Sequence, residues 1–251
     1  MPEYARYALV ALVVLATHFQ EGITGFGCTV LALPFITLLL GLQVAVPVLT
    51  IQGWLLALLL VLESRKKIVW KEFGRILLLV GIGFPFGVWM FRSLPEYYLK
   101  WVLAAFMVVV GIQGFAGQCK RTKQTAVMTP KTRMLTSLFL PLGGIIHGAF
   151  ASGGPFVVIY AARAITDKTL FRVTMCMLWT VLGTLLIGQL AVSSRLTPFV
   201  WKMTGFCLPF TLAGLILGNH AHYRINEVNF RKSLYAVLVA SGIVMVYSLV
   251  S

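Results

Sequence analysis

Charged side chains are scarce in this sequence, and acidic ones are the scarcest. Asp, Glu, Lys and Arg make up 11% of the 251 residues, whereas a soluble domain carries about a quarter. Apolar residues make up 59%, and the mean hydropathy is +0.91. Segments 44–62, 173–194 and 233–251 contain no charged side chain, and each has close to the roughly 20 residues that cross a bilayer. The shortage of charge excludes a soluble protein and predicts α-helices in a membrane.

Cysteine and acidic residues are too few and too scattered for several kinds of chemistry. The four cysteines have no metal-ligand spacing, so we expect no metal, no disulfide set and no cofactor. Lys and Arg number 21 against 7 Asp and Glu, which gives a net charge of +14. In membrane proteins such basic residues collect in cytoplasmic loops. No basic stretch is interleaved with base-stacking aromatics, so nucleic acid is not a predicted partner, whereas membrane lipid is.

The sequence contains an internal duplication. Ser152-Gly153-Gly154 follows Gly25-Phe26-Gly27 at a distance of 127 residues. Later matches recur at a distance of 131: Trp70-Lys71 with Trp201-Lys202, Gly83 and Gly87 with Gly214 and Gly218, and Gly111 with Gly242. We expect a single membrane domain over residues 1–251, with repeat one at 5–117, a linker at 118–133 and repeat two at 134–250. The five apolar segments of each repeat are 7–19, 28–42, 44–62, 73–91 and 97–117, then 134–150, 156–165, 170–192, 199–218 and 233–250.

The distribution of basic residues predicts the topology. A cytoplasmic linker places 16 Lys and Arg residues inside and 5 outside, which agrees with the positive-inside rule. An odd number of crossings per repeat then inverts the second repeat and makes both termini extracytoplasmic. The predicted fold is an all-α polytopic membrane protein of two inverted-topology repeats. The oligomeric state stays open, with a homodimer among the alternatives.

Glycine clusters interrupt the first two segments of each repeat. Glycine lowers helix propensity, so we expect these segments to be short and to break at a glycine-rich turn near the middle of the membrane. Paired interruptions of this kind mark the binding sites of transporters. The helix ends near Cys28-Thr29 and Pro155-Phe156 would offer partial positive charge to an anion. The alternative is that the glycines serve only close helix packing.

The interrupted segments resemble a known family. The stretches concerned are 24–29 (TGFGCT) with Pro34 and Ala45-Val46-Pro47, and 147–155 (HGAFASGGP) with Tyr160 and Phe171-Arg172. They resemble the two repeats of the TauE/SafE family of sulfite and organosulfonate exporters, which are permeases of the four-toluene-sulfonate-uptake type. The resemblance covers nearly the whole chain. It implies export of a small sulfur oxyanion or a related organic anion across the cytoplasmic membrane.

Candidate site residues come from the two breaks and the segments beside them. Arg172 could hold an oxyanion bidentately, or it could anchor a cytoplasmic loop. Glu21 and His147 are candidates for proton coupling, with an interfacial carboxylate and a structural histidine as the alternatives. Gln52 is included because its helix follows the first break. The predicted substrate-binding residues are Gly25, Gly27, Cys28, Thr29, Gln52, Ser152, Gly153, Gly154, Pro155 and Arg172.

The predicted function is export of a small anion, sulfite or an organosulfonate first, by alternating access and with protons as a candidate coupling ion. The alternatives are another small anion, such as thiosulfate or a carboxylate, and an anion channel. Ser152 with His147 also raises a membrane serine hydrolase, which needs the two side chains in contact beside an oxyanion hole. Five residues apart at a helix break they are poorly placed for that chemistry, so an enzyme is not expected.

The topology can be tested by cysteine labelling. We expect a membrane-impermeant maleimide to leave cysteines in the 118–133 linker unlabelled in intact cells and to label them after lysis. The reason is the concentration of Lys and Arg in this linker and in the other loops assigned to the cytoplasm. Labelling of the linker from outside intact cells would contradict the predicted orientation.

Overall fold

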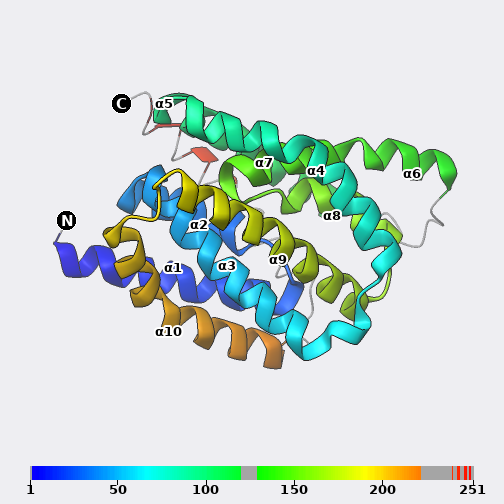
Figure 1. The fold of residues 1–251 in the computed structure, drawn as a ribbon, viewed down its shortest axis with the longest axis horizontal. Coiled ribbons are helices and arrows are strands. Elements are labelled where there is room, and N and C mark those ends of the chain that lie inside the picture. The colour runs from blue at the N-terminus through cyan, green and yellow to red at the C-terminus, as the bar shows by residue number, and fades with distance from the viewer. Residues whose placement is uncertain are drawn as a thin grey trace.

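The computed structural model describes residues 2–119 and 129–221, together with residues 239, 242, 243, 246, 247 and 249. Within these residues every regular element is helical (Figure 1). The first half contains α1 (Glu3–Thr24), α2 (Cys28–Leu40), α3 (Leu42–Ser64), the short turn η1 (Arg65–Lys67), α4 (Trp70–Ser93) and α5 (Glu96–Cys119). The second contains α6 (Pro130–Ser137), α7 (Phe139–Phe150), α8 (Gly154–Ala164), α9 (Lys168–Val192) and α10 (Pro198–Ala221). Most of the expected segment 233–250 and most of the linker lie outside the described residues.

Five of the described helices are long and apolar enough to cross a membrane, namely α1, α3, α4, α9 and α10. Helices α2 and α8 have 13 and 11 residues. At about 1.5 Å per residue both are shorter than the roughly 30 Å of a hydrocarbon core, as the sequence predicts for the second segment of each half. The described residues thus form a multi-pass membrane protein in which two helices extend only part of the way across.

Helix α1 is longer than the sequence predicts. The expected short segment 7–19 is the centre of a helix of 22 residues that continues to Thr24. The glycine at position 22 does not end it, because α10 supports the helix there: a side chain at Gly22 would lie 3.0 Å from the Cα of Gly218. The expectation of a short first segment is therefore wrong for the first half. Helix α7, with 12 residues, is short, and α6 precedes it.

Each half contains a helix that ends at a residue in the left-handed conformation. Helix α1 ends at Gly25 (φ 79°), whose N–H donates to the carbonyl of Glu21. Helix α7 ends at Ala151 (φ 54°), whose N–H donates to the carbonyl of His147. Such a residue is a common helix terminator. By this geometry Glu21 and His147 occupy the same place in the two halves, and the halves correspond here at 126 residues rather than at 127.

The two halves pack against each other through two pairs of helices. Helix α4 of the first half packs against α7 of the second, and α10 of the second half packs against α1 of the first. Helices α3 and α9 pack together between these two pairs (Figure 1). Glycines make this contact close, because any side chain at Gly83 or Gly87 of α4 would collide with carbonyl oxygens of α7. Gly214 and Gly218 of α10 meet the backbone of α1 in the same way. Gly83 and Gly87 thus perform the same packing role in the first half as Gly214 and Gly218 in the second. The inverted orientation of the halves stays a prediction.

The α4–α7 contact predicts a large difference between two nearby glycines. We expect Gly83→Ala to destabilise the protein by about 1–3 kcal/mol, because its methyl group would collide with the Pro141 carbonyl oxygen and force the helices apart. Gly81→Ala is the matched control, since a methyl group there meets no atom within 4 Å. Thermal unfolding of the purified variants in detergent measures both. Equal midpoints for the two variants would contradict the close contact.

Candidate functional site

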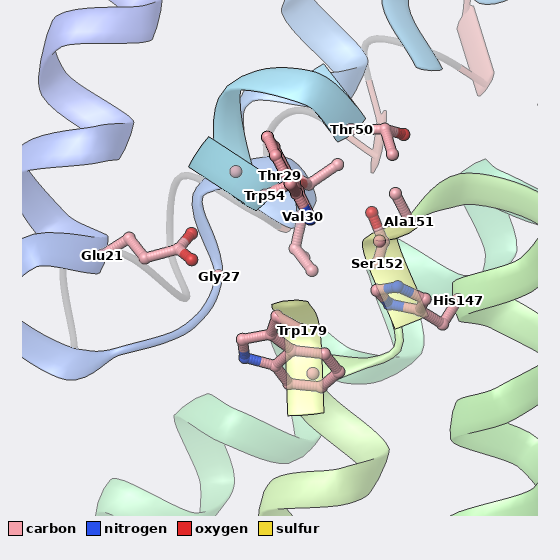
Figure 2. A pocket seen from close by; sticks show the side chains of 13 residues that line it. Glu21, Gly27, Thr29, Val30, Thr50, Trp54, His147, Ala151, Ser152 and Trp179 are labelled. Atoms are coloured by element: carbon pink, nitrogen blue, oxygen red, sulfur yellow. The ribbon is translucent and has the colours of Figure 1, made fainter. Parts of the chain in front are cut away.

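The two broken segments meet around a small cavity of about 40 Å³ (Figure 2). Its wall combines both breaks with α3 of the first half and α9 of the second, so neither half forms the cavity alone. The lining residues are Glu21, Gly27, Thr29, Val30, Thr50, Gly53, Trp54, His147, Ala151, Ser152, Gly154, Trp179 and Gly183. The cavity therefore lies where the sequence places the candidate site, between two helices that end and two that begin.

The first break is closed by a carboxylate of the protein itself. Glu21, which is 3% exposed, accepts a hydrogen bond of 2.8 Å at Oε2 from the backbone N–H of Cys28. An acidic group at the start of a helix is favoured by the helix dipole and by the free N–H groups there. Glu21 thus occupies a position at the amino end of α2 that the sequence analysis assigned to a bound anion. This end of the cavity already contains an anionic group whenever Glu21 is ionised.

The second break is arranged differently. Among the described residues no side-chain hydrogen bond closes the amino end of α8, and Pro155 in its first turn has no N–H. The hydroxyl group of Ser152 donates to the carbonyl of Phe150 at 2.9 Å, and this bond holds the turn at the mouth of α8. The amino end of α8 is therefore open toward the cavity, whereas that of α2 is not.

His147 lies beside the second break with its hydrogen-bonding capacity unused. Its side chain is 5% exposed, and neither ring nitrogen has a hydrogen-bond partner within residues 2–119 and 129–221. The ring stacks on Trp179, with centroids 5.2 Å apart and planes 17° apart, and Phe84 lies on another side at 6.3 Å. A buried polar group without a partner is costly. His147 therefore places two unpaired ring nitrogens beside the cavity.

Two tryptophans connect the halves around the cavity. Trp179 Nε1 of α9 donates to the carbonyl of Gly25 in the first break at 3.2 Å. Trp54 Nε1 of α3 donates to the Thr184 hydroxyl group of α9 at 2.9 Å. The sequence analysis did not select either residue. The signal was available, because tryptophan in membrane proteins is enriched at the interfaces and these two lie in the middle of spanning helices.

The predicted site residues separate into three groups in the structure. Those that line the cavity are Glu21, Gly27, Thr29, His147, Ser152 and Gly154. Those that lie in the breaks or in the first turns beside them, without lining the cavity, are Gly25, Cys28, Gly153 and Pro155. Two lie elsewhere: Gln52 donates to the carbonyl of Thr204 in α10 at 2.7 Å, and Arg172 donates to Oδ1 of Asn219 at 2.9 Å. The side chain of Arg172 packs against Gly25, and neither residue lines the cavity.

A second polar cluster, which the sequence analysis missed, surrounds Glu72 of α4. Its carboxylate pairs with Arg133 of α6 at 2.7 Å and Arg75 at 3.3 Å, and it accepts a hydrogen bond of 2.7 Å from the Tyr160 hydroxyl group of α8. Glu72 is the sole acid between Glu63 and Glu96 and begins an apolar helix, which was the available signal. A buried charge needs such partners. The cluster joins α8 to α4 and α6.

Comparisons with known proteins identify the family of the chain. The family model of the sulfite exporter TauE/SafE matches residues 9–245, which is nearly the whole chain. The chain belongs to the TauE/SafE family. As a member of this family it is a membrane transporter. It is similar to the probable inner membrane transporter protein TsaS of Comamonas testosteroni, with 23% identity over 180 residues that cover 71% of this chain and 72% of that protein. No solved structure matches the chain.

Gly154 gives the sharpest test of the TauE/SafE cavity. A side chain there would point toward the Phe26 ring, with Cβ 3.4 Å from Cδ2, and would meet no backbone. We expect Gly154→Leu to fill the cavity and abolish transport while the protein stays folded in the membrane. Gly27→Leu should also abolish transport. Because Gly27 has φ 101°, a leucine there would strain the backbone as well as fill the cavity, and the loss of transport would have two causes.

Gly188→Leu in α9 is the matched control, because a side chain at this position meets no atom within 4 Å. Membrane insertion is checked by size-exclusion chromatography, and transport by flux of radiolabelled sulfite into proteoliposomes. Wild-type flux through a folded Gly154→Leu variant would show that the cavity is not on the transport path.

Proposed function

We propose that this TauE/SafE protein exports a small sulfur oxyanion, with sulfite as the first choice, across the inner membrane of a prokaryote. The observation that carries the proposal is the single cavity lined by both broken segments and by both third helices. Family membership supplies the transporter class. The name of the relative in Comamonas testosteroni supports the inner membrane as the location.

The chemistry of the cavity favours an oxyanion. The amino end of α8 supplies partial positive charge, and helix ends of this kind bind oxyanions in many proteins. The hydroxyl groups of Thr29 and Ser152 and the ring of His147 add polar atoms to the wall. Apolar and aromatic groups form much of the remainder. A few convergent polar groups in an otherwise apolar wall are typical of a specific binding site.

The size of the cavity favours sulfite over an organosulfonate. The cavity has a volume of about 40 Å³ and is bounded by the side chains of Trp54 and Trp179. A compact anion such as sulfite suits a small cavity better than an organosulfonate, which carries an additional organic group. Thiosulfate and small carboxylates remain the alternative substrates.

The contacts between the halves support alternating access. Each break lies on the helix that packs against the other half, and the third helices α3 and α9 meet beside the cavity. In transporters built from inverted repeats, a rocking motion of one part against the other exposes such a central site to each side in turn. A movement between α3 and α9 would change both walls of the cavity together.

Flux measurements in proteoliposomes test the function. We expect saturable, protein-dependent flux of radiolabelled sulfite, with stronger competition from unlabelled sulfite than from sulfate, thiosulfate, sulfoacetate or acetate. Planar-bilayer recordings of the same protein should show no unitary currents. Stronger competition by another member of the set would replace sulfite with that anion. Unitary anion currents would contradict the transporter mechanism, and absence of flux for all five anions would contradict the oxyanion assignment.

A further inference from the structure

The two halves place different chemistry at the same structural position. Glu21 and His147 each lie four residues before the left-handed residue that ends their helix, and both side chains line the cavity. Glu21 is satisfied locally by the N–H of Cys28, whereas His147 has no hydrogen-bond partner in the described part of the chain. Figure 2 shows the two side chains on opposite sides of the cavity, with Trp179 between them. The scaffold is repeated, but the groups that face a ligand are not.

We propose that the transported oxyanion binds at the His147 side of the cavity, against the amino end of α8, together with one proton carried on the His147 ring. This inference rests on the proposed function and adds to it the location of the anion and its coupling to a proton. Glu21 acts as a fixed cap that closes the α2 end to the anion.

The charges in the cavity wall require such a proton. No Lys or Arg of the described residues lines the cavity, and its sole acidic group is Glu21. An oxyanion that entered with Glu21 ionised and His147 neutral would meet only the partial charge of a helix end, which is roughly half an elementary charge. Protonation of His147 adds a full positive charge and turns both ring nitrogens into donors.

Burial of the His147 ring opposes a positive charge, and one ring contact offsets part of that cost. The imidazole lies parallel to the indole of Trp179, an arrangement that favours a cation through the negative face of the aromatic system. The groups that face the ring from the other elements are uncharged: Phe84 from α4 and Gly153 from the turn before α8. Glu21 of α1, across the cavity, is the one other titratable group in the lining. Among the described residues no other cation lies beside His147, so an oxyanion bound next to the ring would offset the cost of burying its charge.

Paired histidine variants test the proposal. Binding of radiolabelled sulfite to purified protein is measured between about pH 5 and 8, where an imidazole changes charge. We expect wild-type affinity to rise as the pH falls. His147→Gln should bind about 10–100-fold more weakly at the acidic end, the loss of one hydrogen bond to a charged group. The ratio of the two affinities cancels the titration of sulfite itself, because that titration is common to both proteins.

His18→Gln is the matched control. His18 is also a buried histidine, but its Nδ1 pairs with the carbonyl of Val14 at 2.8 Å and it does not line the cavity. We expect the affinity of this variant and its pH dependence to equal those of the wild type. An affinity ratio of His147→Gln to wild type that stays near one across the pH range would overturn the inference and leave the proposed function in place.

Glu21→Gln provides an independent arm, which decides the matter if His147→Gln does not fold. The amide oxygen can still accept from Cys28, but the negative charge is gone, so sulfite should bind more tightly near neutral pH with the pH dependence retained. Loss of the pH dependence in Glu21→Gln would assign the proton to Glu21 and overturn the inference. A wild-type protein that binds none of the oxyanions would overturn the proposed function, and this inference with it.

Discussion

Close backbone contact between α4 and α7, and between α1 and α10, allows this chain to interrupt two helices in an apolar environment. Peptide groups freed at a helix break must be covered by protein or face a polar cavity. At these contacts Gly83, Gly87, Gly214 and Gly218 let two backbones approach without side chains between them. Each broken helix is thereby held by a long helix of the other half. The cavity exists because both supports are present, since the two breaks end on the same small space.

Around this repeated support, the functional groups differ between the halves. Glu21 closes the amino end of α2 through Cys28, while His147 leaves the amino end of α8 open. A duplicated scaffold with identical groups on both sides would offer two equivalent sites for one anion. The observed difference places a carboxyl group on one side of the cavity and an imidazole ring on the other. Such polarity suits a carrier that must bind a charged molecule without a fixed Lys or Arg in the described wall.

The breaks are also linked to the rest of the molecule by specific hydrogen bonds. Trp179 of α9 binds the carbonyl of Gly25, and Glu72 of α4 binds the Tyr160 hydroxyl group of α8. Each bond connects the broken region of one half to a spanning helix of the other. A change in the relative position of the halves must therefore strain or replace these bonds. The same contacts that stabilise the described conformation define which elements have to move.

The sequence alone determined that the protein lies in a membrane, where most of the helices are and where the chain breaks, because these features follow from local properties. The length of an apolar segment fixes whether it can span a bilayer, and glycine permits the backbone at Gly25 and Gly27. The local sequence predicted the wrong end for α1, because packing against α10 lets the helix continue beyond Gly22. Only the tertiary structure decided which side chains face the cavity. It turned Gln52 toward α10 and Arg172 toward Asn219, and it brought Trp54 and Trp179 inward. The rotation of each helix about its own axis depends on contacts with distant segments, and an apolar sequence with little amphipathic pattern does not encode it locally.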